Sequence, residues 1–189
     1  MLAGGGSTRF GRDKLKELYR GAPLLDHVVR RIAEVCPEVV VVVAHDAPDP
    51  ELPPGITVRV ARDLVEGEGP LAGLLAGLAE TRTGLALMAG GDMPELSTAV
   101  LREMLRIAAE AGADAVALQE GDRFRPLPAV VRTALAGGEA RTLLESGERR
   151  LRALLNALRV AVIDEPTWSA LDPERRTLRD IDVPGDLSD

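Results

Sequence analysis

The chain has 189 residues, is 46% hydrophobic but only 2% aromatic, and carries a formal net charge of −7. We expect a single domain over residues 1–189, with a core built mainly from Leu, Val, Ile and Ala. The acidic balance argues against broad nucleic-acid binding, and no apolar run approaches the roughly 20 residues that a membrane span needs. Cys36 is the single cysteine and cannot form an internal disulfide. Because the start also lacks the features of a signal peptide, we expect a cytoplasmic protein.

Short β-branched runs alternate with longer segments of helical periodicity, a pattern typical of a parallel sheet flanked by helices. In chain order, the expected elements are a helix over 23–35, strands over 38–44 and 56–61, a helix over 70–82, a strand within 84–92 that ends in a loop, a helix over 98–112, a strand over 113–119, an extended segment over 126–131, a helix over 149–158 and a strand over 159–164. Ser97 is suited to cap the helix that follows it. The pattern predicts a three-layer αβα sandwich with a mostly parallel, Rossmann-like sheet.

A glycine-rich stretch, MLAGGGSTRFGRDK, opens the chain over residues 1–14. Its consecutive glycines, Gly4, Gly5 and Gly6, would let the backbone turn sharply and approach a ligand closely. Arg9 and Lys14 add positive charge to the same loop. We therefore expect this loop to bind phosphate, the alternative being a simple tight turn after a strand.

Neither of the common phosphate-loop patterns fits this stretch. A P-loop requires Lys and then Ser or Thr after its second glycine, but Gly6 and Gly11 are followed by Arg12 and Asp13. The dinucleotide-binding pattern, counted from Gly4, has its third glycine replaced by Arg9. If the loop binds phosphate, it therefore does so as another class of site, and a simple tight turn remains the alternative.

Three candidate loops follow predicted strands: the glycine-rich loop, ARDLVEGEGP over 61–70 and GGDMP over 90–94. In open α/β sheets ligands bind outside the carboxyl ends of the strands. We therefore expect these loops to gather at one edge of the sheet.

LAGGGSTRFGRDK resembles the signature L-A-[GA]-G-x-S-x-R-[MF]-G-x-x-K of the NTP-transferase family. GAPLLDHVVRRI, ARDLVEGEGPLAGLLAGL, GGDMP and RDIDVPGDL resemble further family segments, so the likeness covers nearly the whole chain. The combination of L-A-G-G, D-K, G-P-L-A-G and G-D-M-P is most similar to the MobA-type molybdenum cofactor guanylyltransferases. That resemblance implies transfer of GMP from GTP to the terminal phosphate of molybdopterin, with release of pyrophosphate, and possible contact with molybdoenzymes or their chaperones.

The resemblance also implies roles for individual residues. Arg9, Lys14 and Asp92 would be catalytic, with the first two offsetting charge on the α-phosphate and the leaving pyrophosphate. The implied nucleotide-binding residues are Leu2, Ala3, Gly4, Gly5, Gly6, Ser7, Lys14, His45, Asp63, Gly69, Pro70, Leu71 and Asp92. A carboxylate at Asp63 suits the paired N1–H and N2–H₂ donors of guanine, although contact with the ribose is the alternative.

Asp92 and Asp182 correspond to positions that the family uses for a metal, which we expect to be Mg²⁺. Carboxylate oxygens are the ligands that this hard cation prefers. The structural alternatives are that Asp92 only caps the loop before Pro94 and that Asp182 is an exposed turn residue.

RFRPLPAVV resembles the acceptor-facing segment of the family, so Arg123 and Arg125 are candidates for binding the pterin phosphate, together with Asp180 and Asp182. The last two stand where this family usually has asparagines. Two alternative hypotheses for the function remain. One is a transferase that uses CTP or another phosphorylated acceptor, and the other is a non-catalytic protein that binds nucleotide and delivers cofactor.

Relatives have four or five apolar residues before L-A-G-G, which form the first, central strand. Here only Met1 and Leu2 precede Ala3. A central strand this short would leave backbone groups of its neighbours unpaired. We expect either a truncated start or another segment that fills the gap.

Overall fold

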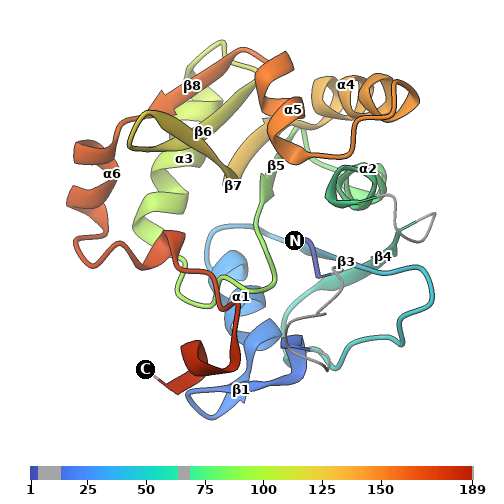
Figure 1. The fold of residues 1–189 in the computed structure, drawn as a ribbon, viewed down its shortest axis with the longest axis vertical. Coiled ribbons are helices and arrows are strands. Elements are labelled where there is room, and N and C mark those ends of the chain that lie inside the picture. The colour runs from blue at the N-terminus through green and yellow to red at the C-terminus, as the bar shows by residue number, and fades with distance from the viewer. Residues whose placement is uncertain (4–13, 64–68, 189) are drawn as a thin grey trace.

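The structure is a computed structural model, and it describes residues 1–3, 14–63 and 69–188 (Figure 1). Its helices are α1 (Leu24–Ala33), α2 (Pro70–Glu80), α3 (Thr98–Glu110), α4 (Thr133–Glu145), α5 (Leu151–Ala157) and α6 (Glu165–Leu171). Its strands are β1 (Leu18–Tyr19), β2 (Ala22–Pro23), β3 (Val39–Val43), β4 (Val58–Arg62), β5 (Leu85–Met88), β6 (Ala115–Glu120), β7 (Arg123–Arg132) and β8 (Val160–Ile163). The 3₁₀ helices are η1 (Lys14–Lys16), η2 (Arg176–Leu178) and η3 (Pro184–Ser188).

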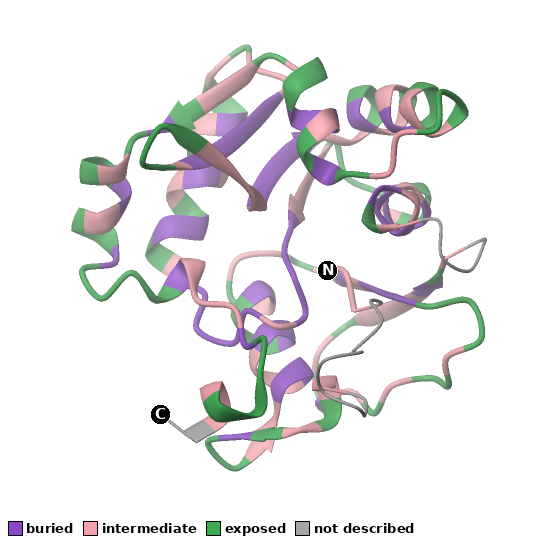
Figure 2. Cartoon of the chain, in the orientation of Figure 1, coloured by how far each residue is buried: buried purple, intermediate pink, exposed green. Residues whose placement is uncertain are grey.

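The strands form a middle layer with helices on both faces, which confirms the predicted three-layer α/β architecture (Figure 1). Successive residues of β6 alternate between two cores: Val116 and Leu118 pack with α1, α3 and α6, whereas Ala115 and Ala117 pack with α2, α4 and α5. Because both faces are covered, the strand is apolar from Ala115 to Leu118. Figure 2 shows the buried residues along these strands and on the inner sides of the helices.

The sheet is mostly parallel, but β7 runs antiparallel to both of its neighbours. β3 pairs with β4 in parallel, and a second group of strands has the order β5-β7-β6-β8. Within that group β6 and β8 are parallel, while β7 opposes β5 and β6. The direction of β7 was not predicted, because a parallel and an antiparallel buried strand look alike in sequence.

Residues 1–3 join these two groups of strands. Leu2 pairs in parallel with Val42 on one side and with Gly90 on the other. The Leu2 amide donates to the carbonyl of Ala89 at 2.9 Å, and the Ala3 amide donates to the carbonyl of Val42 at 2.7 Å. The glycine-rich loop therefore begins where the middle of the sheet ends.

A cavity of about 170 Å³ lies beside Met1, between β3 and β5. Its lining is largely apolar and includes Val40, Leu78, Leu87 and Cys36. Among the described residues, residues 1–3 are the segment that pairs with the strands on either side of this part of the sheet.

The N-terminal ammonium of Met1 is buried next to this cavity and donates to the carbonyl of Val40 at 2.8 Å. Burial lowers its pKa from 8.0 to about 6, since the charged form is disfavoured away from water. Burial likewise raises the pKa of the Cys36 thiol. Cys36 follows α1 and packs, half-buried, against the larger core.

The predicted elements are present with ends that differ by a few residues. Ser97 caps α3 as expected, its hydroxyl accepting from the amide of Val100. The extended segment over 126–131 is part of the longer β7, because partners on both sides continue the ladder. The β1–β2 hairpin, α4 and α6 were not predicted. α4 buries only Ala136 and Ala140, so its sequence shows little amphipathic periodicity.

Within the residues that the structure describes, no helix has both the length and the apolar content needed to cross a membrane.

Candidate functional site

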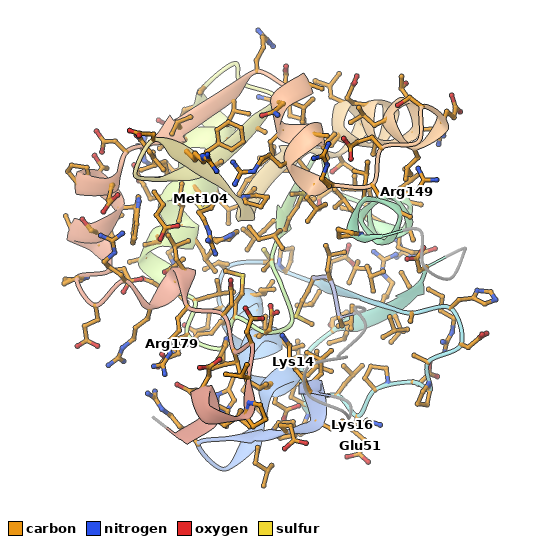
Figure 3. The ribbon with its side chains drawn as sticks, in the orientation of Figure 1. Lys14, Lys16, Glu51, Met104, Arg149 and Arg179 are labelled. Atoms are coloured by element: carbon orange, nitrogen blue, oxygen red, sulfur yellow. The ribbon has the colours of Figure 1, made fainter. Side chains whose placement is uncertain are left out.

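The candidate site lies at the edge of the sheet where Ala3, β4 and β5 end (Figure 3). The predicted residues Gly4, Gly5, Gly6, Ser7 and Arg9 lie outside the described residues. Lys14, the first residue of η1, is the first residue after the predicted phosphate loop that the structure describes.

Lys14 connects two carboxylates that are far apart in sequence. Its Nζ lies 2.9 Å from Oδ2 of Asp92 and 3.4 Å from Oδ1 of Asp182. The Lys14 side chain is only 16% exposed, whereas that of Asp182 is 59% exposed. The structure thus brings together three residues that the sequence analysis assigned to catalysis and metal binding.

The backbone holds the two aspartates in place. Asp92 lies in the loop after β5, and its carbonyl accepts from the amide of Ile181 at 2.9 Å. Asp186 accepts from the amides of Asp182 and Val183 at 2.8 and 2.9 Å, so the turn that carries Asp182 is closed by its own side chain. These bonds lower the pKa of Asp186.

Asp180 lies beside this group and pairs with Arg125. The Arg125 Nη2 is 3.0 Å from the Asp180 carboxylate, and its Nη1 is 3.3 Å from Glu120. Burial, followed by the negative charge of Asp92, raises the pKa of Asp180 even though Arg125 opposes the shift. Arg125 is therefore already paired with carboxylates, while Arg123 is exposed at the start of β7.

Asp63 follows β4, and its amide donates to the carbonyl of Val43 at 2.9 Å. Its Oδ1 is buried and has no hydrogen-bond partner within the described part of the chain. A Cβ on Gly73 would lie 3.7 Å from Oδ2 of Asp63 and 3.6 Å from Leu2, so α2 approaches the site closely here. His45 is near the same strand end, with Nδ1 3.2 Å from the Asp63 carbonyl. A buried acceptor without a donor is a natural ligand contact.

Gly69, Pro70 and Leu71 form the start of α2. Gly69 has φ +81°, and a Cβ there would lie 3.1 Å from Cβ of Arg149. The Leu71 amide donates to the Arg149 carbonyl at 3.2 Å, and the Leu71 side chain is completely buried in the core. Leu71 thus packs the start of α2, which leaves Gly69 and Pro70 nearer to solvent.

Sequence reasoning missed Glu95, three residues after Asp92. Its side chain is only 5% exposed and is flanked by arginines: Arg20 at 2.7 Å, Arg179 at 3.3 Å and Arg176 at 3.9 Å. These arginines come from the β1–β2 hairpin and from the C-terminal segment that carries Asp180 and Asp182. Glu95 therefore ties that segment to the loop of Asp92. A charged residue in the apolar run after GGDMP was the only signal available.

Asp92 and Asp182 fit a divalent cation as a partial set of ligands. Because both reach one ammonium, their oxygens converge on a single point. Mg²⁺ is often held by one or two carboxylates together with substrate phosphates. Among the described residues no group of three or more His, Cys, Asp or Glu side chains could hold a metal alone. The phosphates of a nucleotide would have to complete such a site.

The fold is that of a nucleotidyltransferase, and at the edge of its mostly parallel sheet Lys14 is paired with Asp92, which lies in the loop after β5. The model of the MobA-like NTP transferase domain matches residues 1–162, and the chain belongs to this family. The predicted family and enzyme class are thus confirmed.

Relatives and solved structures agree with this assignment. The chain is 34% identical over 192 residues to a probable molybdenum cofactor guanylyltransferase of Mycolicibacterium paratuberculosis, covering 99% of this chain and 91% of the relative. It is 33% identical to one of Chloroflexus aggregans, covering 99% and 89%. The fold is similar to that of molybdopterin-guanine dinucleotide biosynthesis protein A from Archaeoglobus fulgidus, with a TM-score of 0.76, 24% identity and coverage of 98% and 92%.

Proposed function

We propose that this protein transfers GMP from GTP to the terminal phosphate of molybdopterin. An oxygen of the acceptor phosphate attacks the α-phosphorus of GTP. The new P–O bond forms as the bond from the α-phosphorus to the bridging oxygen breaks, and pyrophosphate leaves with the electron pair. The names of the relatives support the two substrates. The observation that carries the proposal is the convergence of Lys14, Asp92 and Asp182 at the edge of the sheet.

Lys14 and Arg9 would offset the charge that spreads over the phosphate oxygens as the bond to pyrophosphate breaks. Such chemistry depends mainly on positioning and charge stabilisation. A general base is not needed, since the attacking group is already an anion. Backbone amides of the loop from Ala3 to Ser7 would hold the triphosphate.

Mg²⁺ is the proposed cofactor, with Asp92 and Asp182 as its protein ligands. When bound, it would supply positive charge to the phosphate oxygens. The backbone bond from the amide of Ile181 to the carbonyl of Asp92 would hold the loop that carries this carboxylate.

Asp63 is the proposed contact for the nucleoside. Its buried Oδ1, which has no partner among the described residues, would accept a hydrogen bond from guanine or from the ribose. His45 lies close enough to contribute, and Gly73 of α2 borders Asp63. A buried acceptor that needs a donor also gives a physical basis for selecting guanine.

Arg123 is the freer candidate for the acceptor phosphate, because Arg125 pairs with Asp180 and Glu120. We assign Arg125 to the positioning of Asp180. We further propose that the protein acts in the cytoplasm and passes its product to molybdoenzymes or their chaperones.

The test is GMP transfer to molybdopterin, with GTP and CTP binding in the presence of Mg²⁺ measured by calorimetry. Lys14→Met should abolish transfer, whereas Lys16→Met, which removes the same charge from the other end of η1, should keep it. Asp63→Asn should weaken GTP binding by about tenfold, because the amide presents a donor to guanine N1–H. Preference for CTP would replace GTP in the proposal, and binding without transfer would favour a delivery protein.

A further inference from the structure

We infer that Lys14 is a built-in substitute for the divalent cation: its ammonium occupies the cation position between Asp92 and Asp182 until nucleotide and metal bind together. This inference rests on the proposed function, because it takes Asp92 and Asp182 as the metal ligands. It adds a regulatory property of the site, namely that cation and nucleotide bind cooperatively.

The distances place the ammonium and the metal in competition. Lys14 Nζ is 2.9 Å from one carboxylate and 3.4 Å from the other, so it lies in the space between them. A divalent cation shared by these carboxylates would bind within about 2.1 Å of their oxygens. The two positive groups would then be close neighbours, and their repulsion is strong in a partly buried site. A metal bridging Asp92 and Asp182 therefore requires Lys14 to move.

The backbone that carries these carboxylates does not need to move. The carbonyl of Asp92 accepts from the amide of Ile181, and the amide of Asp182 donates to the Asp186 carboxylate, which closes the turn. Neither bond involves the ammonium. The backbone of the ligand pair is thus preorganised, and displacement of Lys14 leaves both bonds intact.

The negative charges around Lys14 outnumber the positive ones, which favours a cation of higher charge at this site. Asp92, Asp180 and Asp182 face Lys14 and Arg125, and Arg125 is shared with Glu120. These three carboxylates and that of Glu120 carry more negative charge than the Lys14 ammonium and the Arg125 guanidinium offset. A doubly charged ion would offset more of it.

The displaced ammonium has an obvious new partner. Lys14 begins η1 directly after the predicted phosphate loop, and lysine carries its charge on a flexible stem of four carbons. Phosphate oxygens of GTP would accept hydrogen bonds from it. Without nucleotide, the ion pairs of Lys14 within the described part of the chain are those with Asp92 and Asp182, so a metal bound alone has to displace them and binds weakly.

The experiment measures Mn²⁺ binding by electron paramagnetic resonance, with and without GTP and in the absence of acceptor. The wild-type protein should bind Mn²⁺ weakly alone and at least tenfold more tightly with GTP, a coupling of the usual size for linked sites. Lys14→Met should bind Mn²⁺ alone about tenfold more tightly than wild type. Lys16→Met, the matched loss of charge at the only other lysine, should behave as wild type.

Lys14→Arg keeps the charge and should keep the weak binding, which separates competition from misfolding. Asp92→Asn should remove the tight binding of the Lys14→Met protein. Equal or weaker Mn²⁺ affinity in Lys14→Met would overturn the inference. The two proposals fail separately. If Lys14→Met binds Mn²⁺ more tightly but the wild-type protein transfers no GMP, only the proposed function is wrong. If the wild-type protein transfers GMP but Lys14→Met does not bind Mn²⁺ more tightly, only the competition between the ammonium and the metal is wrong.

Discussion

The buried amino group of Met1 should make folding stability depend on pH. We would convert this group into an amide by acetylation, which removes its charge but keeps an N–H that can donate to Val40. The cavity beside Met1 offers room for the added atoms. Only the pH-dependent part of the resulting change in the free energy of unfolding reports on the buried charge.

The size and sign follow from the pKa of Met1, which burial lowers from 8.0 to about 6. Above pH 8 the amine is neutral in both states and costs nothing. Below pH 6 it is charged in both states and the folded protein carries the full cost of burying that charge. Two pKa units correspond to about 3 kcal/mol. The free energy of unfolding should therefore rise by this amount between pH 6 and 8.

Urea denaturation of both proteins from about pH 5.5 to pH 8.5 would measure this effect. Other titrating groups are the same in both proteins, so they cancel in the difference between the two curves. We expect acetylation to stabilise the protein by about 3 kcal/mol more at the acidic end than at the alkaline end. Parallel curves would refute the argument, because they would show that Met1 keeps its ordinary pKa in the folded state.

Two further substitutions test the packing around the site. Gly77→Ala would place a Cβ 2.8 Å from Cγ2 of Val42 and should lower the free energy of unfolding by about 1–3 kcal/mol. A smaller loss in a Val42→Ala background would identify the contact with Val42 as the cause. An unchanged free energy of unfolding in both backgrounds would contradict the prediction. Glu95→Gln should lower the free energy of unfolding, measured by urea denaturation, by about 2 kcal/mol, because partly exposed arginines would face each other without their carboxylate. Glu174→Gln, which breaks an exposed ion pair, should lower it by less than about 0.5 kcal/mol. Equal losses in these two variants would argue against a special role for Glu95.

The sequence by itself determined the element types and the chemical character of the site. Helical periodicity and β-branched runs are local signals, and they predicted α1, α2, α3 and the buried strands. The glycine-rich loop and GGDMP are equally local, so their residues could be assigned before any fold was known. α4 and α6 escaped prediction because a weakly amphipathic helix and a seven-residue helix show little periodicity.

The tertiary structure alone decided which of these residues meet. Lys14 contacts Asp92 and Asp182 across separations of 78 and 168 residues, and nothing local to any one of them specifies the others. The same holds for the pairing of Arg125 with Asp180 and for that of Glu95 with its arginines. Side-chain pairing between distant segments depends on how the layers pack. A sequence pattern can therefore predict the chemistry that a residue is able to perform, whereas only the packed fold decides with which partner it performs it.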